Sequence, residues 1–248
     1  MSEQLYGNTY YADRHQRTLP AARAVIGFVQ DRLPMPVRSV LDLGCGVGTW
    51  LSVWQEQGAG VHGLDGDWVP AEHLQIPAGS FRRCNLAQEI PFSGRVDLAM
   101  SLECAEHLPE AAAPMFIDTL CQAADFVVFA AAIPGQTGEG HINEQWPSWW
   151  AQLFAARGFA CRDWIRPAFW DDERIDWWYR QNLLLFVRRE RAGELRPPPA
   201  IDASRPRALV HPGCLDLYLS GVAGPAAVPQ PPRRRRRLSS RIRSFFGR

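Results

Sequence analysis

The stretch Val40-Leu-Asp-Leu-Gly-Cys-Gly-Val-Gly-Thr49 decides the fold of this 248-residue chain. Its apolar first half predicts a buried strand, and its three glycines predict a tight turn before a helix. Glycine at such a turn lets the backbone approach a bound ligand closely. The stretch therefore predicts a ligand-binding strand–loop–helix unit. An ordinary tight turn with a surface aspartate is the alternative.

Two aspartates near this loop indicate the kind of ligand. The spacing Gly-x-Gly-x-Gly differs from the Gly-x-Gly-x-x-Gly of dinucleotide-binding loops. Asp42 stands two residues before Gly44, where a carboxylate suits a cationic ligand better than a pyrophosphate. Asp65 closes the next predicted strand, where a carboxylate can accept hydrogen bonds from both ribose hydroxyls. These features favour a cationic ligand with a ribose, and an NAD-dependent oxidoreductase is the alternative.

Strand and helix patterns alternate on both sides of this unit. A helix is expected over residues 18–33, and further helices over 48–57, near 68–74, and over 110–123 and 146–157. Such alternation is typical of an α/β fold with a mostly parallel sheet and helices on both faces. The expected fold is therefore a Rossmann-like, seven-stranded sheet. The predicted strands are 39–43, 60–64, 81–84, 96–101, 126–132, 159–166 and 181–188.

The Asp-x-Gly-x-Gly-x-Gly loop and the acid that ends the second strand resemble class I S-adenosylmethionine-dependent methyltransferases. The resemblance covers about residues 38–190. It implies that Gly44, Gly46 and Gly48 line the methionine part of S-adenosylmethionine and that Asp42 lies near its amino group. It also implies that Asp65 holds the ribose.

The adenine end of the cofactor is expected to lie against the residues after the second and third strands. Asn85 stands where the family usually has an Asp facing the adenine amino group, and its carbonyl can accept the same hydrogen bond. Trp68 is expected to cover the adenine ring. Ser101, at the end of the fourth strand, is included among the cofactor-binding residues.

An acidic and histidine-containing cluster follows the fourth strand. Glu103, Glu106 and His107 have the spacing i, i+3 and i+4, which would place them on one helical face, and His141 follows the fifth strand. The set resembles the metal site of O-methyltransferases that act on small-RNA 2′-hydroxyls and on ubiquinone precursors, which implies Mg²⁺ or Mn²⁺. Without a metal, catalysis would rest on Glu106 and on His107 or His141 as general base. A third interpretation is that Glu106 and His107 cap a helix and contact the cofactor.

Tryptophan is concentrated in the second half of the chain. Seven of the ten Trp residues lie between positions 146 and 178. Adjacent pairs such as Trp149-Trp150 and Trp177-Trp178 cannot all point into a core. Exposed aromatic faces suit a sugar ring, and simple core packing is the alternative. The region 131–187 also resembles uncharacterised bacterial methyltransferases associated with surface polysaccharides, which implies a glycan acceptor.

Composition divides the chain into four expected parts. They are an N-terminal helical or lid segment (1–37), a methyltransferase domain (38–190), a Pro-rich extension (191–232) and a basic amphipathic tail (233–248). The tail holds eight Arg and no acid. It suits an anionic membrane surface or, less well, nucleic acid, and a solubilising tail is the third possibility.

The remaining composition is that of an ordinary globular protein. The six Cys contain no Cys-x-x-Cys pair, and the first 17 residues contain no apolar segment. We therefore expect a cytoplasmic protein. A peripheral position at the inner membrane surface, through the basic tail, is the alternative. The expected activity is methyl transfer from S-adenosylmethionine to a hydroxyl of a sugar, a glycan or a small metabolite. The alternatives are an RNA methyltransferase and a non-catalytic scaffold with the same fold.

Overall fold

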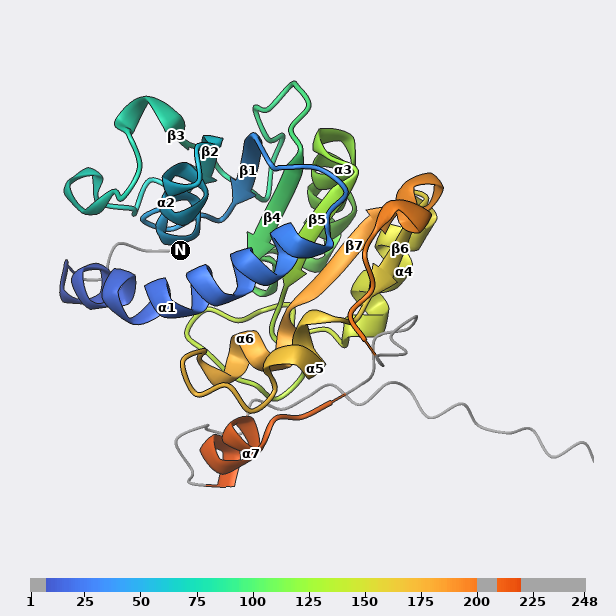
Figure 1. Cartoon of the computed structure of the whole chain (residues 1–248). Helices are drawn as coiled ribbons and strands as arrows, with labels where there is room; N and C mark the ends of the chain where they lie inside the picture. The colour runs from blue at the N-terminus through green and yellow to red at the C-terminus, as the bar shows by residue number, and fades with distance from the viewer. Residues whose placement is uncertain (1–7, 200–208, 220–248) are drawn as a thin grey trace, which may run out of the picture.

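A single seven-stranded sheet forms the centre of the molecule (Figure 1). The computed structural model describes residues 8–199 and 209–219. The strand order is β3-β2-β1-β4-β5-β7-β6, and every pair is parallel except those that β7 makes with β5 and β6. The predicted α/β fold with seven strands is confirmed. The strands are β1 (Ser39–Leu43), β2 (Gly60–Asp65), β3 (Phe81–Arg83), β4 (Leu98–Leu102), β5 (Phe126–Ala130), β6 (Phe159–Arg162) and β7 (Leu184–Arg188).

Helices cover both faces of the sheet, as predicted (Figure 1). One apolar layer joins the sheet to α1, α2, α5 and α6, and the other joins it to α3 and α4. Strands β4 and β5 are buried along their whole length because both of their faces are covered. The helices are α1 (Asn8–Arg32), α2 (Thr49–Glu56), α3 (Ala113–Ala123), α4 (Pro147–Ala156), α5 (Ile165–Phe169), α6 (Trp177–Asn182) and α7 (Pro212–Leu219).

The position of the ligand site follows from the strand order. Strand β1 pairs with β2 on one side and with β4 on the other. Chain connections therefore leave the carboxyl ends of β1 and β4 in opposite directions. In an open parallel sheet, a crevice forms at such a switch point. The glycine loop follows β1, and the acidic and histidine-containing cluster follows β4, so both border this crevice.

The last two predicted strands are shorter than expected. The chain leaves the sheet after Arg162 and forms α5, and it enters β7 only at Leu184, after α6. The pairing of β7 with β5 begins at Leu184 opposite Phe129, so the residues before Leu184 have no strand to pair with. They form a helix that buries Gln181 and Asn182 instead.

Helix α1 begins ten residues before the expected start at residue 18. Pro20 lies inside the helix and removes one backbone hydrogen bond. Pro20 and Gln16 are both exposed. Water can therefore satisfy the carbonyl of Gln16 that lost its partner, and the helix continues through the proline.

Part of the C-terminal extension packs on the domain. Leu195 belongs to the core, and the amide of Arg196 donates to the carbonyl oxygen of Arg32 at 2.9 Å. Helix α7 lies against α6, and Cys214 is buried there. The basic tail 233–248 lies outside the described residues. Within residues 8–199 and 209–219, no helix combines the length and apolar character needed to cross a membrane.

The α4 side of the core makes a testable contribution to stability. Phe154 is fully buried, and its ring stacks on Phe186 at a centroid distance of 3.9 Å. We expect Phe154→Ala to lower the free energy of unfolding by about 3–5 kcal/mol, because it leaves a cavity between α4 and the sheet. Urea unfolding would measure the change. Ile142→Ala, at a side chain that is 65% exposed, should change it by less than about 0.5 kcal/mol. Equal effects of the two substitutions would contradict this packing.

Candidate functional site

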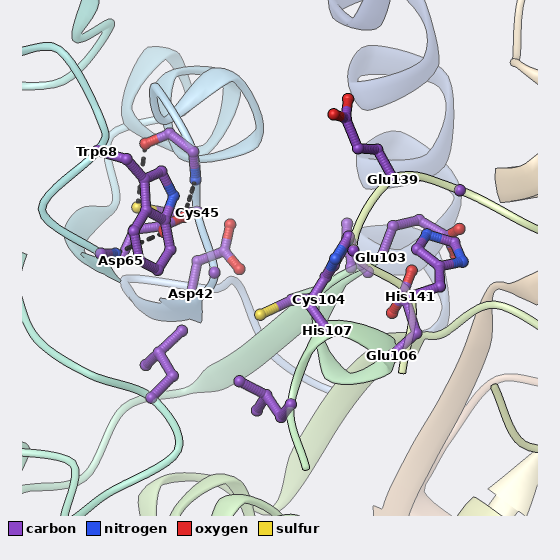
Figure 2. A pocket seen from close by; sticks show the side chains of 18 of the residues that line it. Asp42, Cys45, Asp65, Trp68, Glu103, Cys104, Glu106, His107, Glu139 and His141 are labelled. Atoms are coloured by element: carbon purple, nitrogen blue, oxygen red, sulfur yellow. Dashed lines mark hydrogen bonds between the residues drawn. The ribbon is translucent and has the colours of Figure 1, made fainter. Parts of the chain in front are cut away.

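A cavity of about 1120 Å³ opens at the carboxyl ends of β1, β2 and β4 (Figure 2). Its volume exceeds the 300–1000 Å³ that holds a single ligand of ordinary size, so it has room for two. The glycine loop, Asp42, Asp65 and Trp68 line one end. Glu103, Glu106, His107 and His141 line the other end. The structure therefore brings the two predicted groups of residues into one cavity.

The glycine loop needs glycine for two separate reasons. Gly44, Gly46 and Gly48 all have the left-handed φ angles, 83°, 54° and 84°, that favour glycine. At Gly44 a Cβ would also lie 2.3 Å from the Sγ atom of Cys104, so Cys104, just after β4, could not pack this closely against the loop. At Gly46 a Cβ would meet no atom within 4 Å, and Gly46 lines the cavity. Gly46 therefore leaves open space where a ligand can approach the backbone, whereas Gly44 allows close packing.

Asp65 links the glycine loop to the end of β2. Its Oδ2 accepts a hydrogen bond from the amide of Gly46 at 2.7 Å, and its Oδ1 accepts one from the amide of Gly66 at 2.6 Å. Burial raises the pKa of Asp65 to about 6, although these two amides lower it. Each oxygen of a carboxylate can accept a further hydrogen bond, so a diol remains an acceptable partner.

Asp42 is 2% exposed and lies beside Asp65 at the cavity wall. Its Oδ1 has no hydrogen-bond partner among the described residues. Burial, and secondarily the charge of Asp65, raise the pKa of Asp42 to about 7. A buried carboxylate without a partner is costly, and a bound cation would relieve that cost. The two aspartates therefore fit a ligand that carries positive charge.

The other predicted cofactor residues lie in different environments. The ring of Trp68 lies over Gly66, beside Asp65 (Figure 2). Asn85 is exposed on the cavity wall, and its Oδ1 already accepts a hydrogen bond from the amide of Ala87 at 3.0 Å. Gly48 and Ser101 do not belong to the cavity lining. Gly48 faces Ile76, and the side chain of Ser101 is fully buried in β4.

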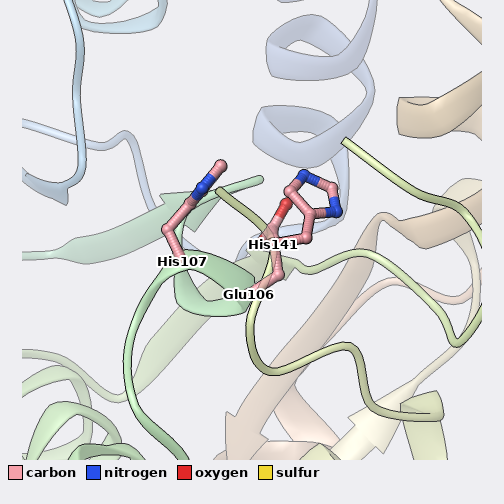
Figure 3. Close-up of side chains that lie close together, drawn as sticks. All are labelled: Glu106, His107 and His141. Atoms are coloured by element: carbon pink, nitrogen blue, oxygen red, sulfur yellow. The ribbon is translucent and has the colours of Figure 1, made fainter. Parts of the chain in front are cut away.

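Three side chains meet at the other end of the cavity (Figure 3). One donor atom each from Glu106, His107 and His141 lies within 4.8 Å of the others. The two imidazole rings meet edge to face with centroids 4.8 Å apart. The 3-10 turn Ala105–His107 carries the first two residues, and the amides of Ile142 and Asn143 donate to the carbonyl oxygen of Glu106. These backbone bonds bring the His141 loop to the turn.

Burial disfavours the charged forms of Glu106 and His107 in this cluster. Glu106 is fully buried, and neither of its carboxylate oxygens makes a well-formed hydrogen bond with a described residue. Burial, and then the charge of Glu103, raise its pKa well above the usual value. Burial, and then the neighbouring His141, lower the pKa of His107 to about 4, so His107 is neutral at pH 7. Neutral imidazole and an unpartnered carboxyl can bind a cation or accept a proton.

Glu103 does not join this cluster, contrary to the prediction of a shared helical face. Its backbone is left-handed, with a φ of 53°, and the 3-10 turn begins only at Ala105. The spacing i, i+3 and i+4 therefore does not apply. The carboxylate instead accepts hydrogen bonds from Gln136 at 3.0 Å and Asn182 at 2.9 Å. Sequence spacing gives no sign of these partners, because 33 and 79 residues separate them from Glu103.

The aromatic residues divide between the core and the cavity. Trp150 packs in the core against Phe129, and Trp149 contacts it edge to face. Trp177 and Trp178 of α6 line the cavity. Of the two adjacent Trp pairs noted in the sequence, one therefore lies on the cavity wall. Arg14 and Thr18 of α1 also line the cavity, and the sequence pattern gave no signal for them.

Comparisons with known proteins agree with the fold. No curated protein matches the sequence. The structure resembles DesVI from Streptomyces venezuelae (13% identity, 69% of this chain and 92% of that one, TM-score 0.55). It also resembles magnesium protoporphyrin IX methyltransferase from Synechocystis PCC 6803 with bound SAH (21% identity, 70% and 83%, TM-score 0.50). An O-methyltransferase family protein from Burkholderia thailandensis shares 15% identity over 73% of this chain and 59% of that one, with a TM-score of 0.50.

At these identities the structural matches show the fold alone. The sequence itself matches the family model described as "Methyltransferase domain" over residues 4–182. This match covers the sheet from β1 to β6 and both ends of the cavity. The chain therefore belongs to the methyltransferase-domain family.

Proposed function

We propose that the protein transfers a methyl group from S-adenosylmethionine to a hydroxyl of a sugar, a glycan or a small metabolite. The observation that carries the proposal is the single cavity that joins the Asp42–Asp65 end to the His107–His141 end. The first end offers carboxylates to a ligand with a ribose and positive charge. The second offers groups that handle a proton. One of the structural neighbours contains bound SAH, the product of such a transfer, which supports the choice of cofactor.

The reaction needs in-line positioning and one proton acceptor. The acceptor oxygen forms a bond to the methyl carbon while the carbon–sulfur bond breaks and its electron pair stays on sulfur. The protein aligns the two partners and takes the hydroxyl proton. The Nδ1 of His141 lies 2.9 Å from Oε1 of Glu144. With Nδ1–H donating to that carboxylate, Nε2 of His141 is left as the proton acceptor.

The charges around the second end favour a neutral acceptor. Glu103 and Glu106 line this end, and Glu144 hydrogen-bonds to His141 beside it. A phosphate would add negative charge next to these acidic groups. Trp177 and Trp178 offer aromatic faces to a ring with C–H groups. An RNA acceptor carries a phosphate on every nucleotide and fits this end less well. Binding of S-adenosylmethionine without transfer to any hydroxyl would leave the scaffold alternative.

The same cluster has a second candidate role as a divalent cation site. Glu106, His107 and His141 fit a metal because their donor atoms lie within 4.8 Å and the Glu106 oxygens lack partners among the described residues. A mixed set of carboxylate and imidazole donors suits Mn²⁺ better than Mg²⁺. A bound cation would polarise the acceptor hydroxyl and lower its pKa. Glu103 is held elsewhere by amides, so the predicted four-residue set is reduced to three.

The cofactor site can be tested with substitutions at two glycines that both have positive φ angles. Gly46 and Gly58 both have positive φ angles, and a Cβ at either meets no atom within 4 Å. Only Gly46 lines the cavity. We expect Gly46→Ala to weaken S-adenosylhomocysteine binding in calorimetric titration by at least about 10-fold, because the methyl group would occupy ligand space. Gly58→Ala should leave the affinity unchanged. Equal affinities of both variants and the wild type would place the ligand elsewhere.

Cofactor affinity should depend on pH. The pKa values of about 7 for Asp42 and about 6 for Asp65 mean that both carboxyls gain protons as the pH falls below neutrality. A cationic ligand favours the ionised forms, so binding at low pH must release protons. The affinity for S-adenosylmethionine should therefore rise between pH 5.5 and 7.5 and level off above. Asp42→Asn should bind more weakly and flatten the profile. A profile that is flat in the wild type would contradict the assignment.

The cation site can be tested with Mn²⁺ alone. We expect calorimetric titration to show one saturable site, and His107→Asn to weaken it by about 10-fold or more, because one ligand is lost. His62→Asn, at an exposed histidine outside the cavity, is the matched control. Binding that both variants leave unchanged would exclude the cluster as the metal site and leave its histidines as proton acceptors.

A further inference from the structure

Two residues of the cavity wall adopt an unusual backbone conformation. Among the described non-glycine residues, only Glu103 and Thr137 have positive φ angles, 53° and 56°. Both line the cavity, and Thr137 is β-branched, for which this conformation is an outlier. Strain of this kind persists only where the surroundings impose it, and it concentrates at functional sites. Contacts with other parts of the fold must therefore hold Glu103 and the loop around Thr137 in these backbone conformations.

The restraint is a chain of buried amide groups. Gln136, Gln181 and Asn182 are 5%, 0% and 2% exposed. Asn182 donates to Oε1 of Glu103, and Gln136 donates to Oε2. The Oε1 of Gln136 in turn accepts from Gln181 and from Asn182, each at 2.9 Å. Two side chains from two separate segments thus donate to one carboxylate, and Gln181 holds one of them from behind.

The direction of this chain is set by a backbone group. The amide of His211 can only donate, and it donates to Oε1 of Gln181 at 2.8 Å. The NH₂ group of Gln181 must therefore face Gln136, whose carbonyl oxygen accepts from it. The NH₂ group of Gln136 must then face Glu103. The orientation of each amide thus fixes the orientation of the next one. Residue 103 therefore faces NH₂ donors on both sides and must offer two acceptor oxygens, which a carboxylate has and an amide does not.

We propose that Glu103 is the residue that selects a neutral, polyhydroxylated ring as the methyl acceptor. This inference rests on the proposed function and names its substrate class. Each Glu103 oxygen receives one amide donor and keeps capacity for one more hydrogen bond. Trp177 and Trp178 belong to the same α6 segment as Asn182 and line the same cavity. A sugar ring offers what this wall lacks, namely hydroxyl donors at its edge and C–H groups on its face.

The same chain assigns a role to the segment 209–219. His211 holds Gln181 through its backbone amide and the carbonyl oxygen of Trp170 through its ring, at 3.1 Å. Gly213 lies against Trp177, so close that a Cβ there would meet the ring at 2.9 Å. The segment therefore supports both the amide chain and one aromatic wall. Gln136, Gln181, Asn182 and His211 are positioning residues, and Glu103 is the residue that contacts the acceptor.

The test uses full-length protein, S-adenosylmethionine and a defined probe panel. The panel contains the methyl pyranosides of glucose, galactose and mannose, each beside the corresponding hexose 6-phosphate. We expect the wild type to methylate at least one neutral pyranoside in preference to its phosphate. Glu103→Gln should lower kcat/KM for it by at least about 10-fold, mainly through KM, since a lost hydrogen bond to a charged group has effects of this size. S-adenosylhomocysteine binding should stay unchanged.

The controls separate this inference from the proposed function. Glu110→Gln makes the same chemical change at an exposed position outside the cavity and should keep the wild-type KM. If Glu103→Gln does not fold, Glu103→Asp can replace it. This variant keeps the charge but moves the carboxylate away from the amides, so KM should rise as well. Three results would overturn the inference. They are a preference for the phosphates, no methylation of any neutral pyranoside at 50 mM (roughly the limit of weak specific binding), and an unchanged KM in the folded Glu103→Gln variant. Failure of the wild type to bind S-adenosylhomocysteine would instead overturn the proposed function.

Discussion

The carboxylate of Asp65 holds the glycine loop against the end of β2 through two backbone amides, those of Gly46 and Gly66. This contact fixes the turn between β1 and α2, and the turn fixes one end of the cavity. It requires a charged group to be buried beside a second one, Asp42, which has an unpartnered oxygen. A fold that served stability alone would have no reason to place two carboxylates there. The cost is understandable when a cationic ligand completes the site.

The other end of the cavity also contains carboxyl groups with little access to solvent, but they have different partners. Glu103 is half-buried, and the loss of solvent around it raises its pKa to about 7, although amides from Gln136 and Asn182 lower it. Glu106 receives no such compensation from the described side chains. The Asp42–Asp65 end therefore favours a positively charged ligand. At the other end, neutral amides already orient the Glu103 carboxylate, whereas the Glu106 carboxyl has no side-chain partner among the described residues. This division matches a reaction with a cationic donor and a neutral acceptor.

The sequence predicted the fold well because its decisive signals are local. The apolar run before Gly44, the acid at residue 65 and the alternation of patterns each depend on neighbouring residues, and all appear in the structure. The start of β7 depends on where β5 stops pairing, which is a non-local constraint, so the assignment of residues 181–183 to a strand is wrong. The placement of Glu103 was wrong for the same reason. Its partners lie in a loop and a helix that only the folded sheet brings together.

We propose that Asp65 and the glycine loop form the cofactor site of this methyltransferase-domain protein. The most direct test is a crystal structure of the complex with S-adenosylhomocysteine. We expect both ribose hydroxyls to lie within about 3 Å of the Asp65 oxygens, with the sulfur facing the space between Asp42 and His107. A ligand bound outside this cavity, or one whose ribose contacts no oxygen of Asp65, would contradict it.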